Sequence, residues 1–206
     1  MSIDTYLYKI KKETIRNEIY YMSGLIDMDD FGRFQNANEA NDMAQIHLAN
    51  YIISRKFKSY RDICYEENKI KKDPMPFAND FYNFSKDIVS DILKKSDGIE
   101  ILTFGTIEKV QAYAKFNGKV YDLNINNASQ AMPEVKSLKL GDDAVEISTD
   151  NWKLFEMMYA DKFKSITAES YVKAVDSIYG YHLEKMQARE EMIAASRAKR
   201  KMKSGV

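Results

Sequence analysis

Hydrophobic side chains recur every three to four positions through the first half of the chain, with Lys, Glu and Asn between them. This spacing predicts helices over four segments: residues 4–23, 39–55, 58–71 and 78–95. Gly24 and Gly98 are stop signals after the first and the last of these, and Asn38 can cap the second. The third is expected to end before Asp73-Pro74, because a proline disfavours helical backbone in the residue before it.

After Gly98 the hydrophobic period changes from 3.6 to 2, which indicates β-strands. Four strands are predicted: residues 99–106, 109–116, 119–125 and 144–149. Asn117-Gly118 joins the second strand to the third, and this pair favours a type I′ turn because both residues tolerate positive φ. Residues 126–142 are predicted to form a long connection between strands.

Helical spacing returns after the last predicted strand. Thr149 or Asp150 can cap a helix from Trp152 to about Phe163, and Thr167 can cap a final helix that continues to about residue 200. The element order predicts an α+β fold that is mostly α, in which a small antiparallel sheet or hairpin is inserted between a helical bundle and closing helices.

With 206 residues the chain is expected to form a single domain, 1–206. Within it, four regions follow from the pattern: a helical region over residues 1–97, a small antiparallel sheet over 98–149, closing helices over 150–200 and a basic tail over 201–206.

The predicted hairpin has two unlike faces. Val110, Ala112 and alternate residues after them form an apolar face, whereas Tyr113 and Lys115 lie on a mixed one. We therefore expect a sheet that is covered on one side, with the other side free to contact a partner. The expected contact residues of the hairpin are Tyr113, Lys115, Lys119 and Tyr121.

Composition narrows the functional classes. The 31 basic and 31 acidic residues balance, so the chain as a whole carries no signal for binding a polyanion. The lone Cys64 excludes an internal disulfide, and no apolar run reaches the roughly 20 residues of a membrane span. The N-terminus lacks the apolar core of a signal peptide. Aromatic residues clustered at 77–84 favour core packing or protein contacts.

No motif for catalysis, cofactor binding or metal binding emerges. Residues 27–39 resemble a calcium loop, but Phe31 and Asn38 occupy positions where ligand oxygens belong. His47 and His182 have no partners at ligand spacing, and His47 is expected to pack between helices. Neither a phosphate-binding loop nor a nucleophile elbow is present. We therefore expect a protein without enzymatic activity, with an enzyme of unrecognised type as the remaining alternative.

The C-terminal end concentrates positive charge. From residue 192 onward the chain carries five cations and no acid: Arg197, Lys199, Arg200, Lys201 and Lys203. Three interpretations stay open: a solvated tail, docking onto an acidic protein surface, or contact with nucleic-acid phosphates.

The segment "GKVYD", with Gly118, Tyr121 and Asp122, resembles the Gly-x-x-Tyr-Asp hairpin of the head–tail adaptor (tail tubular protein A) family of short-tailed phages. The order of helices, small sheet and closing helices over residues 78–165 is similar to that family as well. Pro133-Glu134 is a departure, because in the family such a pair is expected directly before the closing helix.

The resemblance implies a structural virion protein that forms a ring of identical subunits in the phage neck, connecting portal and tail proteins after assembly in the host cytoplasm. It implies no cofactor and no membrane, and it brings the subunit near DNA. In this role the basic end would dock onto the portal. The alternative hypothesis is a nucleic-acid-associated or host-modulating phage protein that acts through the same basic end, and a cytoplasmic location would then be expected.

Overall fold

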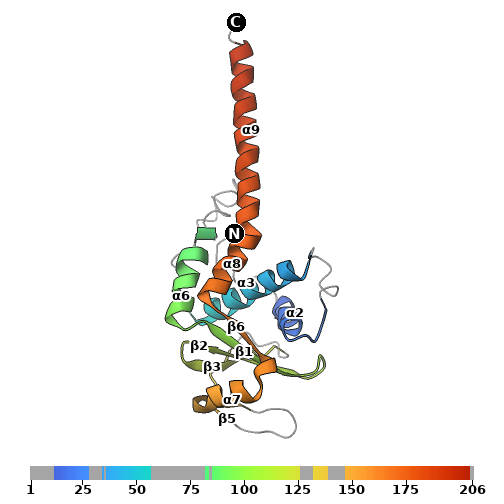
Figure 1. Cartoon of the computed structure of the whole chain (residues 1–206), viewed down its shortest axis with the longest axis vertical. Coiled ribbons are helices and arrows are strands. Elements are labelled where there is room, and N and C mark those ends of the chain that lie inside the picture. Colours follow the sequence, from blue (N-terminus) through green and yellow to red (C-terminus); the bar gives the residue numbers. More distant parts are fainter. Residues whose placement is uncertain are drawn as a thin grey trace.

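The computed structural model describes residues 12–27, 34, 36–56, 82–83, 85–125, 132–138 and 147–204. These residues form a mixed α+β fold in which helices dominate, as the sequence predicts (Figure 1). A four-stranded antiparallel sheet lies below a group of helices, and a long C-terminal helix, α9, projects away from both (Figure 1).

The first described helix ends close to its expected end at residue 23, whereas its expected start at residue 4 lies outside the described residues; the second is close to its expected bounds. Helix α2 spans Lys12–Met22 and α3 spans Ala37–Lys56, and the two pack against each other. The cap of α3 lies earlier in the chain than expected: the Asn36 Oδ1 atom, not Asn38, accepts a hydrogen bond from the Glu39 N–H at 2.9 Å. The predicted helix 58–71 and the break at Asp73-Pro74 lie outside the described residues.

The helix expected over 78–95 is only partly α-helical. Its described portion contains a π-helical segment, η3 (Ser85–Val89), that continues into α6 (Ser90–Lys95). Gly98 follows with φ +79, a conformation that glycine adopts at little cost, and its N–H donates to the Leu93 carbonyl at 2.6 Å. This bond satisfies one of the last carbonyls of α6, so the expected stop is confirmed.

The main sheet has the strand order β3-β2-β1-β6. Three strands lie where alternation predicts them, and the fourth was not expected: β1 (Ile99–Gly105), β2 (Val110–Phe116), β3 (Lys119–Asp122) and β6 (Phe163–Ile166). Asn117 and Gly118 both have positive φ, 52° and 72°, which confirms the type I′ turn between β2 and β3.

The predicted strand 144–149 does not join this sheet. Its described portion, β5 (Ile147–Ser148), pairs instead with β4 (Ser137–Leu138) in a separate two-stranded ladder. Residues 132–135, expected within a connection, line the edge of β3. There the Asp122 N–H donates to the Pro133 carbonyl and the Val135 N–H to the Val120 carbonyl, at 3.0 and 2.9 Å.

Both faces of the sheet are covered, so the expectation of a one-sided sheet is wrong. On one face Ile101, Ala114 and Tyr121 belong to the core shared with α2, α3, α6 and α8. On the other face a smaller cluster covers the sheet through α7 (Trp152–Met158): Leu102, Tyr113, Val120, Leu138, Trp152 and Phe155. The sheet is thus the middle layer between the helices and α7.

The closing helices are shorter and more interrupted than expected. A 3-10 turn, η4 (Thr149–Asn151), precedes α7, whose N-cap is Asn151 without a side-chain cap; the predicted cap from Thr149 or Asp150 is therefore wrong. After η5 (Ala160–Lys162) the chain enters β6, so Phe163 begins a strand rather than ending a helix.

Candidate interaction surface

Residues 168–204 form a nearly continuous helix. Helix α8 (Ala168–Val175) leads into a second π-helical segment, η6 (Asp176–Gly180), and then into α9 (Tyr181–Ser204). Its start is fixed by a capping box, in which the Thr167 Oγ1 atom accepts from the Ser170 N–H and the Ser170 Oγ accepts from the Thr167 N–H, both at 3.0 Å. The predicted cap at Thr167 is confirmed.

Helix α8 is anchored in the core of the molecule. Tyr171, Ala174 and Val175 are fully buried, and the Tyr171 hydroxyl donates to the Asn50 Oδ1 atom on α3 at 2.8 Å. Since this hydrogen bond is buried, removing either partner would leave the other polar group without a hydrogen-bond partner and out of reach of water, which would destabilise the fold. Helix α8 is therefore held against α3, and it also packs against α6 and η3.

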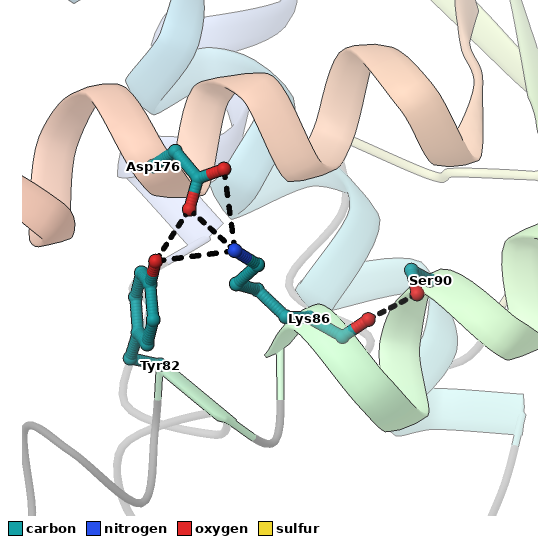
Figure 2. A network of polar contacts seen from close by, with 4 residues as sticks. All are labelled: Tyr82, Lys86, Ser90 and Asp176. Atoms are coloured by element: carbon teal, nitrogen blue, oxygen red, sulfur yellow. Dashed lines mark hydrogen bonds and ion pairs between the residues drawn. The ribbon is translucent and has the colours of Figure 1, made fainter.

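A polar network holds the junction at η6 (Figure 2). The Tyr82 hydroxyl donates to the Asp176 Oδ1 atom at 2.6 Å, and the Lys86 ammonium lies 3.0 Å from the same oxygen. Lys86 also donates to the Tyr82 hydroxyl at 3.2 Å, which closes a triangle between the two π-helical regions. One turn further along, the Ser90 hydroxyl donates to the Lys86 carbonyl.

Charge matching in this network shifts two pKa values in opposite directions. The hydrogen bond from Tyr82, followed by that from Lys86, lowers the pKa of Asp176 below its ordinary value of 3.8. The hydrogen bond to Asp176 in turn raises the pKa of Lys86. Because both groups are driven towards their charged forms, they suit a fixed ion pair and not proton transfer at neutral pH.

Beyond this junction α9 leaves the rest of the molecule. Among the side chains that the structure describes, Leu183 is the last buried one, and every one from residue 187 to residue 202 is exposed. We call residues 187–204 the arm; it points away from the sheet and the other helices (Figure 1). All of α9 is 24 residues long, which corresponds to about 36 Å at 1.5 Å per residue.

The arm combines positive charge with exposed apolar side chains. Arg197, Lys199 and Arg200, three of the residues expected to contact a partner, are exposed. Lys201 and Lys203 continue the helix, but their side chains lie outside the described portion of the chain. The large apolar side chains Met192, Ile193 and Met202 are exposed by 69%, 43% and 75%.

The two tyrosines that were expected to form a contact surface on the hairpin are buried. Tyr113 is 5% exposed and Tyr121 is 8% exposed, and they lie on opposite faces of the sheet. Burial raises the pKa of the Tyr121 hydroxyl, which is the expected effect of moving its charged form away from water. Both tyrosines are buried within the chain, so the prediction that their side chains contact a partner directly is wrong.

The two lysines of the hairpin are engaged within the chain. Lys115 lies 3.2 Å from the Glu100 carboxylate, and Lys119 lies 2.8 Å from Glu134 on the segment that lines β3. Lys119 is more exposed than Lys115 and keeps some of its side chain at the surface. The structure places Lys119 close enough to Tyr121 for the two to interact electrostatically, but the four hairpin residues do not form one contiguous exposed surface.

Sequence reasoning missed the Tyr82–Lys86–Asp176 network. The four-residue spacing of Tyr82 and Lys86 places them on one helical side, but Asp176 lies 94 positions from Tyr82. No local pattern could have indicated that contact.

Sequence reasoning also missed the exposed apolar side of α7, where Leu154, Met157 and Met158 are exposed by 57%, 79% and 61%.

The polar contact between α2 and α3 stabilises the packing of these two described helices. His47 on α3 lies 2.8 Å from the buried Glu18 on α2, which confirms that this histidine packs between helices. Within the described residues no three His, Cys, Asp or Glu side chains gather as metal ligands would. Among those residues, too, no helix has the length and hydrophobicity to cross a membrane.

No protein-family model, curated protein or solved structure matches this chain. The functional conclusion must accordingly be drawn from the chain's own surfaces.

Proposed function

We propose that this chain is a structural assembly protein whose arm docks into another protein. The observation that carries the proposal is the exposure of the arm on all sides although it bears Met192, Ile193 and Met202. Large apolar side chains left exposed on a projecting element are a common mark of an interaction site. Covering them with a partner would remove apolar surface from water, which is the main driving force of association.

The charges of the arm support the same proposal. Arg197 and Lys201 are four residues apart, as are Lys199 and Lys203, so like charges face each other along the helix. The favourable interaction of cations with a helix C-terminus offsets some of this repulsion. A partner surface rich in Asp and Glu would relieve the rest, and its attraction would weaken as salt concentration rises.

The particular assembly we propose is a phage neck, in which identical subunits form a head–tail connector ring between portal and tail proteins of the virion. The sequence resemblance at Gly118, Tyr121 and Asp122 suggests it, and the order of helices, sheet and closing helices is compatible with it. In that setting the arm would dock onto an acidic surface of the portal. The contacts between subunits would involve surfaces other than Tyr113 and Tyr121.

Light scattering coupled to size-exclusion chromatography tests the proposal. The full chain is run over a wide concentration range, alone and with a portal protein, beside the variant Arg197→Glu/Lys199→Glu. We expect association that the double variant weakens, whereas the matched charge change at the exposed Lys173 leaves it unaltered. A full chain that stays monomeric at high concentration and ignores the portal would refute the proposal.

A second candidate function, nucleic-acid association, is favoured by the exposure of Arg197, Lys199 and Arg200 on a segment without acids. Titrating duplex DNA at two salt concentrations, with the full chain and with a chain lacking residues 192–206, separates the two. Binding that requires the arm and falls steeply with salt would favour this second function, because such binding releases counterions from phosphates. Absence of binding would leave the assembly function in place.

A further inference from the structure

The exposed large apolar side chains of the described residues gather on two elements. Seven such side chains are present among those residues: Ile107, Leu154, Met157, Met158, Met192, Ile193 and Met202. All except Ile107 lie on α7 or on the arm. Ile107, in the turn between β1 and β2, stands apart from both groups. Two separate apolar surfaces on one small protein are more than scattered surface residues would give.

The side of α7 that faces away from the sheet carries a continuous group of exposed apolar side chains. Leu154, Met157 and Met158 follow the i, i+3, i+4 spacing that places side chains on one side of a helix. Trp152 and Phe155 point the opposite way into the core and are 2% and 0% exposed. Because these two rings fix α7 on the sheet, the three outer side chains form a supported platform rather than a loose loop.

Acidic side chains flank this platform at both ends. Asp150 in η4 and Asp161 in η5 are exposed, and Asp161 also lies 3.2 Å from Lys162. We call Asp150, Leu154, Met157, Met158 and Asp161 the α7 patch. The chain from residue 139 to residue 162 contains six acids and three lysines, whereas residues 193–204 contain five cations and no acid. Three of those acids, Asp142, Asp143 and Glu146, lie outside the described residues, and the patch is defined without them.

The arm and the α7 patch lie at opposite ends of the molecule (Figure 1). A single copy therefore cannot bring its own arm onto its own patch, but two copies can. We propose that the arm of one copy docks on the α7 patch of a second copy, with Met192 and Ile193 against Leu154, Met157 and Met158. Met202 follows Ile193 by nine residues, which at about 100° per residue places it on the opposite side of the helix, so it lies outside this contact. The cations of the arm then lie near Asp150 and Asp161. This inference rests on the proposed function, in which the arm docks onto a protein, and it assigns the arm to a second copy of the chain in place of the portal.

Such a contact joins two different surfaces. Repeating this contact either closes a ring or extends an open filament. An open filament keeps one free arm at one end and one free patch at the other. The chemistry of the two surfaces is matched twice, once by apolar side chains and once by opposite charge, and the latter favours the correct orientation. Pairing of two arms would leave Leu154, Met157 and Met158 uncovered, so it would account for only one of the two apolar surfaces.

A complementation experiment with the full chain tests the inference. The arm variant is Arg197→Glu/Lys199→Glu, and the patch variant is Asp150→Lys/Met157→Ser. Each is studied alone and in a 1:1 mixture by sedimentation velocity. The fluorescence of Trp152, the single tryptophan, reports whether α7 remains packed in each variant.

We expect each variant alone to associate at least about tenfold more weakly than the natural chain. The mixture should form a complex of two chains, since the arm variant keeps its patch and the patch variant keeps its arm. Lys153→Glu provides the converse test: this exposed cation on α7 opposes the arm, so its reversal should tighten association at low salt. The matched control Gln111→Glu, at an exposed position on β2, should change nothing.

Three outcomes would overturn the inference. If the patch variant alone still associates through its arm, the arm binds elsewhere, and the proposed assembly function stands without the α7 patch. If the arm variant alone still associates, two patches pair with each other. A natural chain that is monomeric but binds a portal through its arm would keep the proposed function and remove the second copy as the partner.

Discussion

Glu100 holds α7 on the sheet, and replacing it should loosen that helix measurably. Its Oε2 atom accepts a hydrogen bond from the Trp152 Nε1–H at 2.6 Å and lies 3.2 Å from the Lys115 ammonium. Glu100 is on the central strand β1, directly opposite Lys115 on β2. One carboxylate oxygen thus connects two strands of the sheet to the helix that covers them.

The magnitude follows from what each substitution leaves behind. Glu100→Ala leaves the indole N–H of Trp152, a side chain only 2% exposed, without its acceptor, which costs about 1–3 kcal/mol. The loss of the partly exposed ion pair with Lys115 adds roughly 0–1 kcal/mol. Glu100→Gln keeps an acceptor oxygen for the indole, so we expect it to lose about 1 kcal/mol or less.

Thermal unfolding followed by tryptophan fluorescence measures the difference, because Trp152 is the only tryptophan in the chain. For a chain of this length each kcal/mol corresponds to roughly 2–4 °C in melting temperature. Glu100→Ala should therefore melt clearly below both the natural chain and Glu100→Gln. Equal stability of the two variants would show that this hydrogen bond does not hold α7, and the reasoning would fail.

Three further predictions concern the helix junctions. Because the network of Figure 2 lowers the pKa of Asp176, its contribution to stability is present above pH 3.8 and is lost as the pH falls through the depressed value; the acid loss in urea midpoint should be smaller in Asp176→Asn. Gly98→Ala should destabilise by about 1–2 kcal/mol or more in chemical denaturation, since φ is +79 and the new Cβ would lie 2.6 Å from the Ile166 carbonyl oxygen. Gly180→Ala, with open space and ordinary φ, is its control and should not destabilise. Thr167→Ala removes a capping box and should lower unfolding free energy by about 1 kcal/mol, and an unchanged calorimetric melting temperature would contradict the role of the cap.

The local pattern of the sequence was sufficient for elements that are stabilised locally. The turn at Asn117-Gly118 and the cap at Thr167 were predictable because each depends on residues a few positions apart. Strand β6 was not predictable in this way. Phe163–Ile166 is four residues long and becomes a strand by pairing with Ile99–Leu102, more than 60 positions earlier in the chain.

The error about the hairpin has a similar cause. Alternation correctly separates Tyr113 from Ala112 and Ala114, but it cannot show whether an element from elsewhere covers the second face. Here Trp152 and Phe155 arrive from α7 and bury Tyr113. The exposed basic end of the arm was easier to predict, because consecutive charges without acids rarely fit inside a fold.

The π-helical segment η6 lies between the anchored helix α8 and the arm, and it determines how the arm is rotated about its own axis. An α-helix advances about 100° with each residue, so inserting or removing one residue at η6 would turn every side chain of the arm by that angle while leaving its composition unchanged. Met192 and the cations would then present a different side to the partner. In the proposed assembly, a one-residue change at η6, outside the arm itself, would therefore alter the angle between neighbouring copies and with it the number of subunits at which a ring closes.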